Sequence, residues 1–91
     1  MIEKEKIIEV IRQDATGRRV LKDGEGNYCV VGGLMHEVGD EPTRYQCLPS
    51  AAQLEWLFYH YGLRPKEVTR LIGCNDSHYE VESRRAALIA L

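Results

Sequence analysis

The cysteine at position 29 is the residue whose type and setting most directly suggest chemistry. Cys29 comes directly before residues 30–38, whose apolar residues are too dense for a surface strand and indicate a helix. We expect this helix to begin near Cys29 or Val30 and to end at Gly39. At a helix N-terminus, unpaired amides and the helix dipole favour the thiolate, which is the nucleophilic form. A cysteine-dependent enzyme would also need a base within hydrogen-bond reach.

Three histidines are the available bases for such a thiol. On an unbroken helix His36 would lie about 10 Å from Cys29, which is too far for a direct hydrogen bond. His60 or His78 would have to be brought there by tertiary packing, which the sequence does not show. We therefore predict no catalytic residue. We expect a buried, inert thiol at a strand-to-helix junction, with no imidazole within hydrogen-bond reach.

The spacing of the candidate ligand residues does not fit a metal site or a cofactor site. Structural zinc sites pair their ligands at short intervals, whereas here only Cys74 and His78 are close together. The adjacent Gly32 and Gly33 lack the patterns that cradle phosphates. Glycine within a helix costs about 1 kcal/mol relative to alanine, so we interpret this pair as allowing another backbone to pass close by. We expect no metal and no cofactor.

Residues 62–75, GLRPKEVTRLIGCN, resemble the first part of a helix-turn-helix of the phage-repressor type. A DNA-binding role for residues 62–85 is therefore one alternative. The recognition helix would carry acidic residues that face phosphates at an energetic cost, namely Asp76, Glu80 and Glu82. The basic Arg84 and Arg85 come late in this helix, where they could form a small basic patch. On charge grounds a plain helical hairpin is favoured over DNA binding.

An aromatic cluster in residues 54–62, LEWLFYHYG, suggests a contact surface instead. Its rings point in several directions around a helix, so some must be exposed or buried against a second partner. Trp56 lies off the inward stripe of this helix and is the better candidate for an exposed contact. The predicted binding residues are Trp56, Tyr59, His60, Arg84 and Arg85.

The elements that must position these residues predict an α+β, mainly helical fold. Residues 3–13 carry apolar residues on one helical stripe. Around the turn at Asp23 and Gly24, strand-favouring residues predict a short β-hairpin that pairs residues 18–22 with residues 26–30. About four further helices follow around one core.

Helix boundaries are best marked in the second half of the chain. Residues 50–53, SAAQ, have the spacing of a capping box, and Gly62 stands where a helix ends. Pro65 fits the first turn of the next helix, which we expect to end at Gly73. Residues 77–80, SHYE, repeat the capping-box spacing before a last helix. The predicted core comprises Ile7, Ile11, Val31, Leu34, Leu54, Leu57, Phe58, Val68, Leu71, Ile72 and Leu88.

Length and composition fit one small domain, residues 1–91. Hydrophobic residues make up 44% of the chain and the formal net charge is −2, so no basic excess indicates nucleic acid. No segment is long and apolar enough to cross a membrane, and the first residues lack the pattern of a secretory signal. We therefore expect a cytoplasmic protein. Its cysteines, odd in number, are expected to be free thiols.

The order of short motifs resembles a group of small uncharacterised phage and prophage proteins. Their pattern is a charged hairpin, a Cys-x-x-Gly helix start, a later Leu-Pro, a Gly-Leu, and an Asn-Asp before a final helix. This chain departs from several members of the group at Val30, where they have a second cysteine, and at residues 32–34. The matching positions here are Cys29, Gly32, Leu48, Pro49, Gly62, Leu63, Asn75 and Asp76. The resemblance spans about residues 17–91 and implies a phage or mobile-element origin.

Together these features predict a small non-enzymatic binding protein. Our hypothesis is that it acts on a host or phage macromolecule, as a regulatory or counter-defence factor, in the host cytosol if it is phage-encoded. We expect the partner to be a protein, with nucleic acid less favoured and no membrane. The alternatives are a helix-turn-helix-like DNA-binding protein (residues 62–85) and a cysteine-dependent enzyme that uses Cys29. The oligomeric state and the partner's identity are open at this point.

Overall fold

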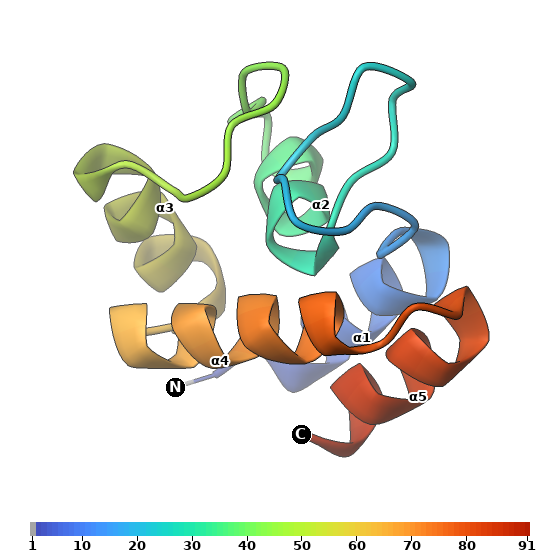
Figure 1. The fold of residues 1–91 in the computed structure, drawn as a ribbon. Helices are drawn as coiled ribbons and strands as arrows, with labels where there is room; N and C mark the ends of the chain where they lie inside the picture. Colours follow the sequence, from blue (N-terminus) through green and yellow to red (C-terminus); the bar gives the residue numbers. More distant parts are fainter. Residues whose placement is uncertain (1) are drawn as a thin grey trace.

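The computed structural model describes residues 2–91, which fold into five helices (Figure 1). Two irregular segments, residues 14–29 and 38–50, connect the second helix to its neighbours in the chain. The helices are α1 (Lys4–Gln13), α2 (Val30–Glu37), α3 (Ala51–Tyr61), α4 (Pro65–Ser77) and α5 (Val81–Ala90).

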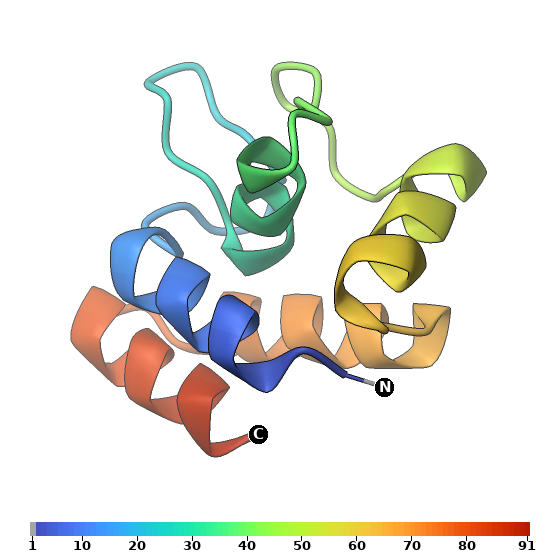
Figure 2. The ribbon, with the colours of Figure 1, turned by 180° about the vertical axis from the view of Figure 1, so that it is seen from behind.

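Helix α2 is the centre around which the other elements pack. Its first six residues, Val30–Met35, are all buried. Helices α1, α3 and α4 all contact α2, while α5 packs against α1 and α4. Figure 2 shows α1 between α2 and α5. A helix that is apolar on every side can be stable only when it is covered in this way.

The close approach expected at the paired glycines of α2 is confirmed. A Cβ atom built on Gly32 would lie only 1.8 Å from the carbonyl oxygen of Leu21. The backbone of residues 14–29 therefore crosses directly over the first turn of α2. Any side chain at position 32 would push this segment away, because protein interiors leave little free space.

The β-hairpin expected over residues 18–22 and 26–30 is not formed, and the α+β prediction is wrong. Between residues 2 and 91 there is no strand, and the two arms share one isolated antiparallel bridge between Lys22 and Tyr28. Over the described range the fold is all-α.

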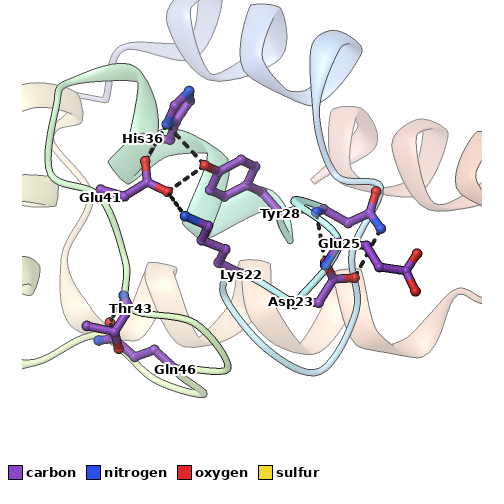
Figure 3. Close-up of polar contacts among 9 residues, drawn as sticks. Lys22, Asp23, Glu25, Tyr28, His36, Glu41, Thr43 and Gln46 are labelled. Carbon is purple, nitrogen blue, oxygen red and sulfur yellow. Dashed lines mark hydrogen bonds and ion pairs between the residues drawn. The ribbon is translucent and has the colours of Figure 1, made fainter.

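The reason is that only the turn of the expected hairpin forms, while its arms find other partners. The Asp23 carboxylate accepts a hydrogen bond from the amide of Asn27 at 2.9 Å and so closes the turn (Figure 3). On one side of it, the amide of Leu21 donates to the carbonyl of Gln46. On the other side, Cys29 already caps α2. A ladder cannot extend once these backbone groups are bonded elsewhere.

The predicted boundaries of α3 and the start of α4 are confirmed. The Ser50 hydroxyl accepts from the amide of Gln53 at 3.2 Å, and the Gln53 side chain accepts from the amide of Ser50 at 2.7 Å. This reciprocal capping box fixes the start of α3. Gly62 follows α3 with φ of 73°, in the left-handed region that favours glycine, and Pro65 is the first residue of α4.

Helix α4 does not end at Gly73, as the sequence predicted, but continues to Ser77. The Ser77 hydroxyl donates to the carbonyl of Gly73 at 2.7 Å, within the helix, so the second predicted capping box does not form. Glu80 takes the N-cap position of α5 instead. The extra turn is held by Asn75, which is fully buried against the segment that crosses α2.

Most of the predicted core is confirmed, with one clear error. Leu54 and Ile72 are half-buried at the edge of the core. Phe58 is 53% exposed, because α3 faces the core through Leu57 and Tyr61. The predicted residues that are buried are Ile7, Ile11, Val31, Leu34, Leu57, Val68, Leu71 and Leu88.

Candidate functional site

Cys29 is a buried structural thiol, as expected. It is the N-cap residue of α2, and its sulfur accepts a hydrogen bond from the amide of Gly32 at 3.5 Å. Burial raises the pKa of the Cys29 thiol to about 11. Near neutral pH the thiol is therefore protonated and a poor nucleophile. Among the described residues, Cys29 forms no hydrogen bond with an imidazole.

The exposed side of α3 carries a stripe of aromatic residues. Ala52, Trp56 and Tyr59 follow one another at helical spacings of four and three, which places them on the same face. Trp56 is 48% exposed and Tyr59 is 78% exposed. We call this surface, with His60 behind it, the α3 aromatic face.

The rings of the α3 aromatic face hold one another in place. His60 stacks on Trp56, with centroids 4.9 Å apart and planes 14° apart. Tyr59 meets Trp56 edge-to-face at 6.0 Å and meets His60 in the same manner at 5.0 Å. Such pairs are worth about 0.5–1.5 kcal/mol beyond the area they bury. These contacts therefore hold the rings of Trp56, Tyr59 and His60 in a fixed arrangement on the surface.

Little charge accompanies these rings. Glu55 is the sole charged residue within α3. At the opposite edge of the helix Phe58 is also exposed, and Leu48 is exposed just before α3 begins. The Nε2 atom of His60 is buried without a hydrogen-bond partner. The α3 end of the molecule therefore exposes several large apolar side chains with little charge between them.

A second group of polar side chains, which the sequence did not reveal, surrounds Glu41 (Figure 3). The Glu41 carboxylate accepts hydrogen bonds from the Tyr28 hydroxyl at 2.5 Å and from the Lys22 ammonium at 2.7 Å, and it pairs with His36 Nδ1 at 2.5 Å. The Tyr28 and His36 rings stack at 4.8 Å. No short-range pattern links the four residues of this Glu41 cluster, because they come from three segments of the chain.

The electrostatics of the Glu41 cluster favour a structural role over a catalytic one. Burial favours the neutral acid, but the hydrogen bonds from Lys22, Tyr28 and His36 outweigh it and lower the pKa of Glu41 to about 2. The hydrogen bond to Glu41, supported by burial, raises the pKa of Tyr28 to about 12. The carboxylate is thus a poor base and the phenol a poor acid at neutral pH. The cluster ties residues 38–50 to α2.

The two arginines predicted as binding residues are turned toward the protein. Arg84 is only 3% exposed, and its guanidinium donates to the carbonyls of Ala15, Gly17, His78 and Tyr79 at 2.6–3.3 Å. Arg85 is half-buried and donates to the carbonyl of Asp14 at 2.9 and 3.0 Å. Arg85 therefore satisfies the carbonyl of the C-cap residue of α1, and Arg84 satisfies carbonyls of the segments that follow α1 and α4.

The Asn-Asp pair contributes to the same buried region. Asn75 accepts from the amide of Val30 at 3.0 Å and donates to the carbonyl of Gly17 at 3.1 Å. Asp76 accepts from the amide of Arg19 at 2.8 Å. We call Asn75, Arg84 and the backbone groups they bond the Asn75–Arg84 network. This network brings four parts of the chain together. The structural role of these hydrogen bonds is therefore enough to explain the Asn75-Asp76 motif.

In comparisons with protein families, with curated proteins and with solved structures, nothing matches this chain. None of the helices described over residues 2–91 has the length and apolar character needed to cross a membrane. In the same range, no cluster of three or more His, Cys, Asp or Glu side chains is arranged to hold a metal ion.

Proposed function

We propose that this protein is a small non-enzymatic binding domain that docks onto a protein partner through the α3 aromatic face. One observation carries the proposal: Trp56 and Tyr59 are exposed side by side on one helix, where Trp56 stacks on His60 and Tyr59 packs edge-to-face against both rings. Trp and Tyr are the residues most often found at binding hot spots, because they bury a large area at a low cost in side-chain entropy.

A helix face of this kind fits a groove on a partner. Ala52, Trp56 and Tyr59 provide anchors at the spacing with which helices enter apolar grooves. The low charge of α3 also supports this, because charged residues are depleted at the centres of interfaces. The resemblance to phage and prophage proteins extends the proposal to a regulatory or counter-defence factor that acts on a host or phage protein in the host cytosol.

The arrangement of α5 argues against the DNA-binding alternative. A recognition helix needs basic or polar side chains that reach base edges and phosphates. Arg84 and Arg85 both bond backbone carbonyls of their own chain instead. The exposed residues of α5 are Glu82, Ser83, Ala86, Ile89 and Ala90. Their one formal charge is negative, so this face would repel phosphates.

The cysteine-dependent enzyme is the weaker alternative still. Cys29 is buried, its thiol pKa is raised to about 11, and its sulfur caps α2. Nucleophilic catalysis needs the opposite setting, namely partial exposure, a base in contact and a thiol pKa near or below neutrality.

Site-specific photo-crosslinking would test the binding proposal. A photoreactive phenylalanine analogue placed at Tyr59 should crosslink one partner in a lysate of the cell that naturally makes the protein. The same analogue at Tyr79, an equally exposed tyrosine at the other end of the molecule, is the matched control. Crosslinking of the same partner from both positions, or from neither, would contradict the assignment of this face.

A substitution should then separate binding from folding. Trp56→Ala should weaken the affinity for the crosslinked partner by about tenfold or more, as expected for a hot-spot residue. Because Trp56 is half-exposed, the free energy of unfolding should fall by only about 1 kcal/mol. Calorimetric titration and urea unfolding measure the two effects. A collapse of stability with unchanged affinity would make Trp56 a core residue and remove the main support for the proposal.

A further inference from the structure

A groove on the far side of the molecule from α3 has several arginine side chains in its lining. It has a volume of about 670 Å³ and lies between the segment after α1 and the start of α5. In Figures 1 and 2, α3 and α5 stand at opposite ends of the fold. The groove is lined by Thr16, Arg18, Arg19, Tyr79, Glu80, Val81 and Arg84. Three arginines and one glutamate give it a positive charge in a protein whose formal net charge is −2.

These arginines carry charge that no carboxylate neutralises directly. Over residues 2–91, the ion pairs within 4.0 Å involve Lys6, Lys22 and His36 and none of the groove arginines. Asp76, the nearest acid with an identified contact, accepts from the backbone amide of Arg19 rather than from a guanidinium.

Two donors of the groove arginines have no hydrogen-bond partner among the described residues. The Nε atom of Arg18 is buried and has no hydrogen-bond partner, although its guanidinium lies over the Tyr79 ring at 5.2 Å. Arg84 is almost fully buried, and one N–H of its Nη2 atom remains without a partner after the bond to the Tyr79 carbonyl. Leaving buried donors unpaired is costly, so an acceptor between these side chains would be stabilising.

The start of α5 adds further donors to the same groove. Glu80 occupies the N-cap position without a side-chain cap, and Val81 lines the groove. The first hydrogen bond of α5 runs from the Arg84 amide to the Glu80 carbonyl, so the amides before it have no partner within the helix. Amides at a helix N-terminus, together with guanidinium groups, are a recurrent setting for phosphate.

We propose that this groove binds a phosphate group carried by a small molecule, with Arg18, Arg19 and Arg84 as its cationic ligands and the first amides of α5 completing the site. A phosphate dianion matches the charge of the groove, and its several oxygens match the number of donors. Burial and the neighbouring Arg18 charge lower the pKa of Arg84, which is the direction that an added anion would reverse.

Titration of the full chain with inorganic phosphate, followed by amide NMR at constant ionic strength, tests this site. The expected result is saturable shifts at residues 16–19 and 80–84, with weaker binding of acetate. Adenosine monophosphate should produce the same shifts if the phosphate can be carried by a nucleotide. Shifts that do not saturate, or that chloride reproduces, would overturn the proposal.

Variants of Arg18 and Arg19, with a control elsewhere, make the test specific. Arg19→Gln and Arg18→Gln should each weaken phosphate binding by about tenfold, because each removes a charge-assisted donor. Arg12→Gln, an exposed arginine on α1, is the matched control and should bind as the natural protein does. Thermal unfolding of each variant confirms that it is folded.

Two outcomes would overturn the proposal at this stage. One is an equal loss of phosphate binding in the Arg12→Gln control. The other is phosphate binding by Arg18→Gln and Arg19→Gln that is as strong as in the natural protein, which would show that the groove is not where phosphate is recognised.

Discussion

Two polar networks fasten the irregular segments of this chain to its helices, and they differ mainly in their exposure to solvent. In the Asn75–Arg84 network both side chains are buried. In the Glu41 cluster the side chains of Glu41 and His36 are 40% and 50% exposed. The hydrogen bonds to the Glu41 carboxylate are the shorter ones, at 2.5–2.7 Å against 2.6–3.3 Å in the buried network, yet water competes for those of the Glu41 cluster alone.

The difference teaches that exposure, more than bond length, decides what a polar network contributes to stability. An exposed ion pair gains little, because both charges are well solvated when the pair is broken. A buried group whose partner is removed loses its hydrogen bond and cannot regain one from water. The same kinds of atoms should therefore give a large effect in one network and a small one in the other.

The largest expected effect is for Arg84→Met. This change keeps much of the side-chain volume but removes the donor from the carbonyls of Ala15, His78 and Tyr79, while the Gly17 carbonyl keeps its bond from Asn75. We expect the free energy of unfolding to fall by about 3–4 kcal/mol, measured by urea unfolding. Arg85→Met, at a half-buried position, should cost about 1 kcal/mol. Equal costs for the two variants would show that burial is not the deciding factor.

A smaller loss is expected for Asn75→Ala. The variant leaves the amide of Val30 unpaired, removes one of the two side-chain hydrogen bonds to the Gly17 carbonyl, and opens a small cavity at the end of α4. We expect a loss of about 2–3 kcal/mol in thermal or urea unfolding. Gln13→Ala removes an exposed amide from α1 and should change stability by about 0.5 kcal/mol at most. A comparable loss in this control would contradict the comparison.

The smallest effect is expected for Glu41→Gln, and it should depend on pH. Because the pKa of Glu41 is lowered from 4.5 to about 2 in the folded protein, its ionised form stabilises the fold. This contribution is fully present above the unfolded pKa and is lost as pH falls toward about 2. At neutral pH the variant should lose about 1 kcal/mol or less, since the cluster is exposed to solvent.

Urea unfolding of both proteins across this pH range measures that dependence. The difference in stability between the natural protein and Glu41→Gln should shrink steadily as the pH falls below 4.5. A difference that stays constant would mean that Glu41 acts through its shape rather than through its charge.

The predictable parts of the fold are those that local sequence determines. The Ser50–Gln53 capping box, Gly62 and Pro65 act within one turn of a helix, and all three were predicted correctly. The expected exposure of Trp56 also followed from the helical stripe of its own segment. Each of these signals needs only its near neighbours in the chain.

The errors come from tertiary contacts that override local preference. Gly73 is a plausible helix end, but α4 continues because Asn75, two residues later, bonds the segment crossing α2. The turn at Asp23 forms as expected, but the amide of Leu21 bonds Gln46 instead of a hairpin partner. Phe58 obeys the apolar stripe of α3, yet the core meets that helix one residue earlier, at Leu57.

The candidate site was predictable only where it lies within a single helix. Trp56, Tyr59 and His60 are close in sequence, so their grouping on α3 was visible in advance. The inward turn of Arg84 was not visible, because the carbonyls it bonds in the first part of the chain are 67 and 69 residues away. The groove that includes Arg18 and Arg19 depends on the same long-range contact and was missed for that reason.

The position of Arg84 in the chain also sets an order of events during synthesis. The carbonyls of Ala15 and Gly17 leave the ribosome early, but the guanidinium that bonds them is made only in the last helix. Contacts between such distant residues form late, because the entropy of closing a long loop must be overcome first. The backbone between α1 and α2 therefore stays open to chaperones and proteases until α5 emerges.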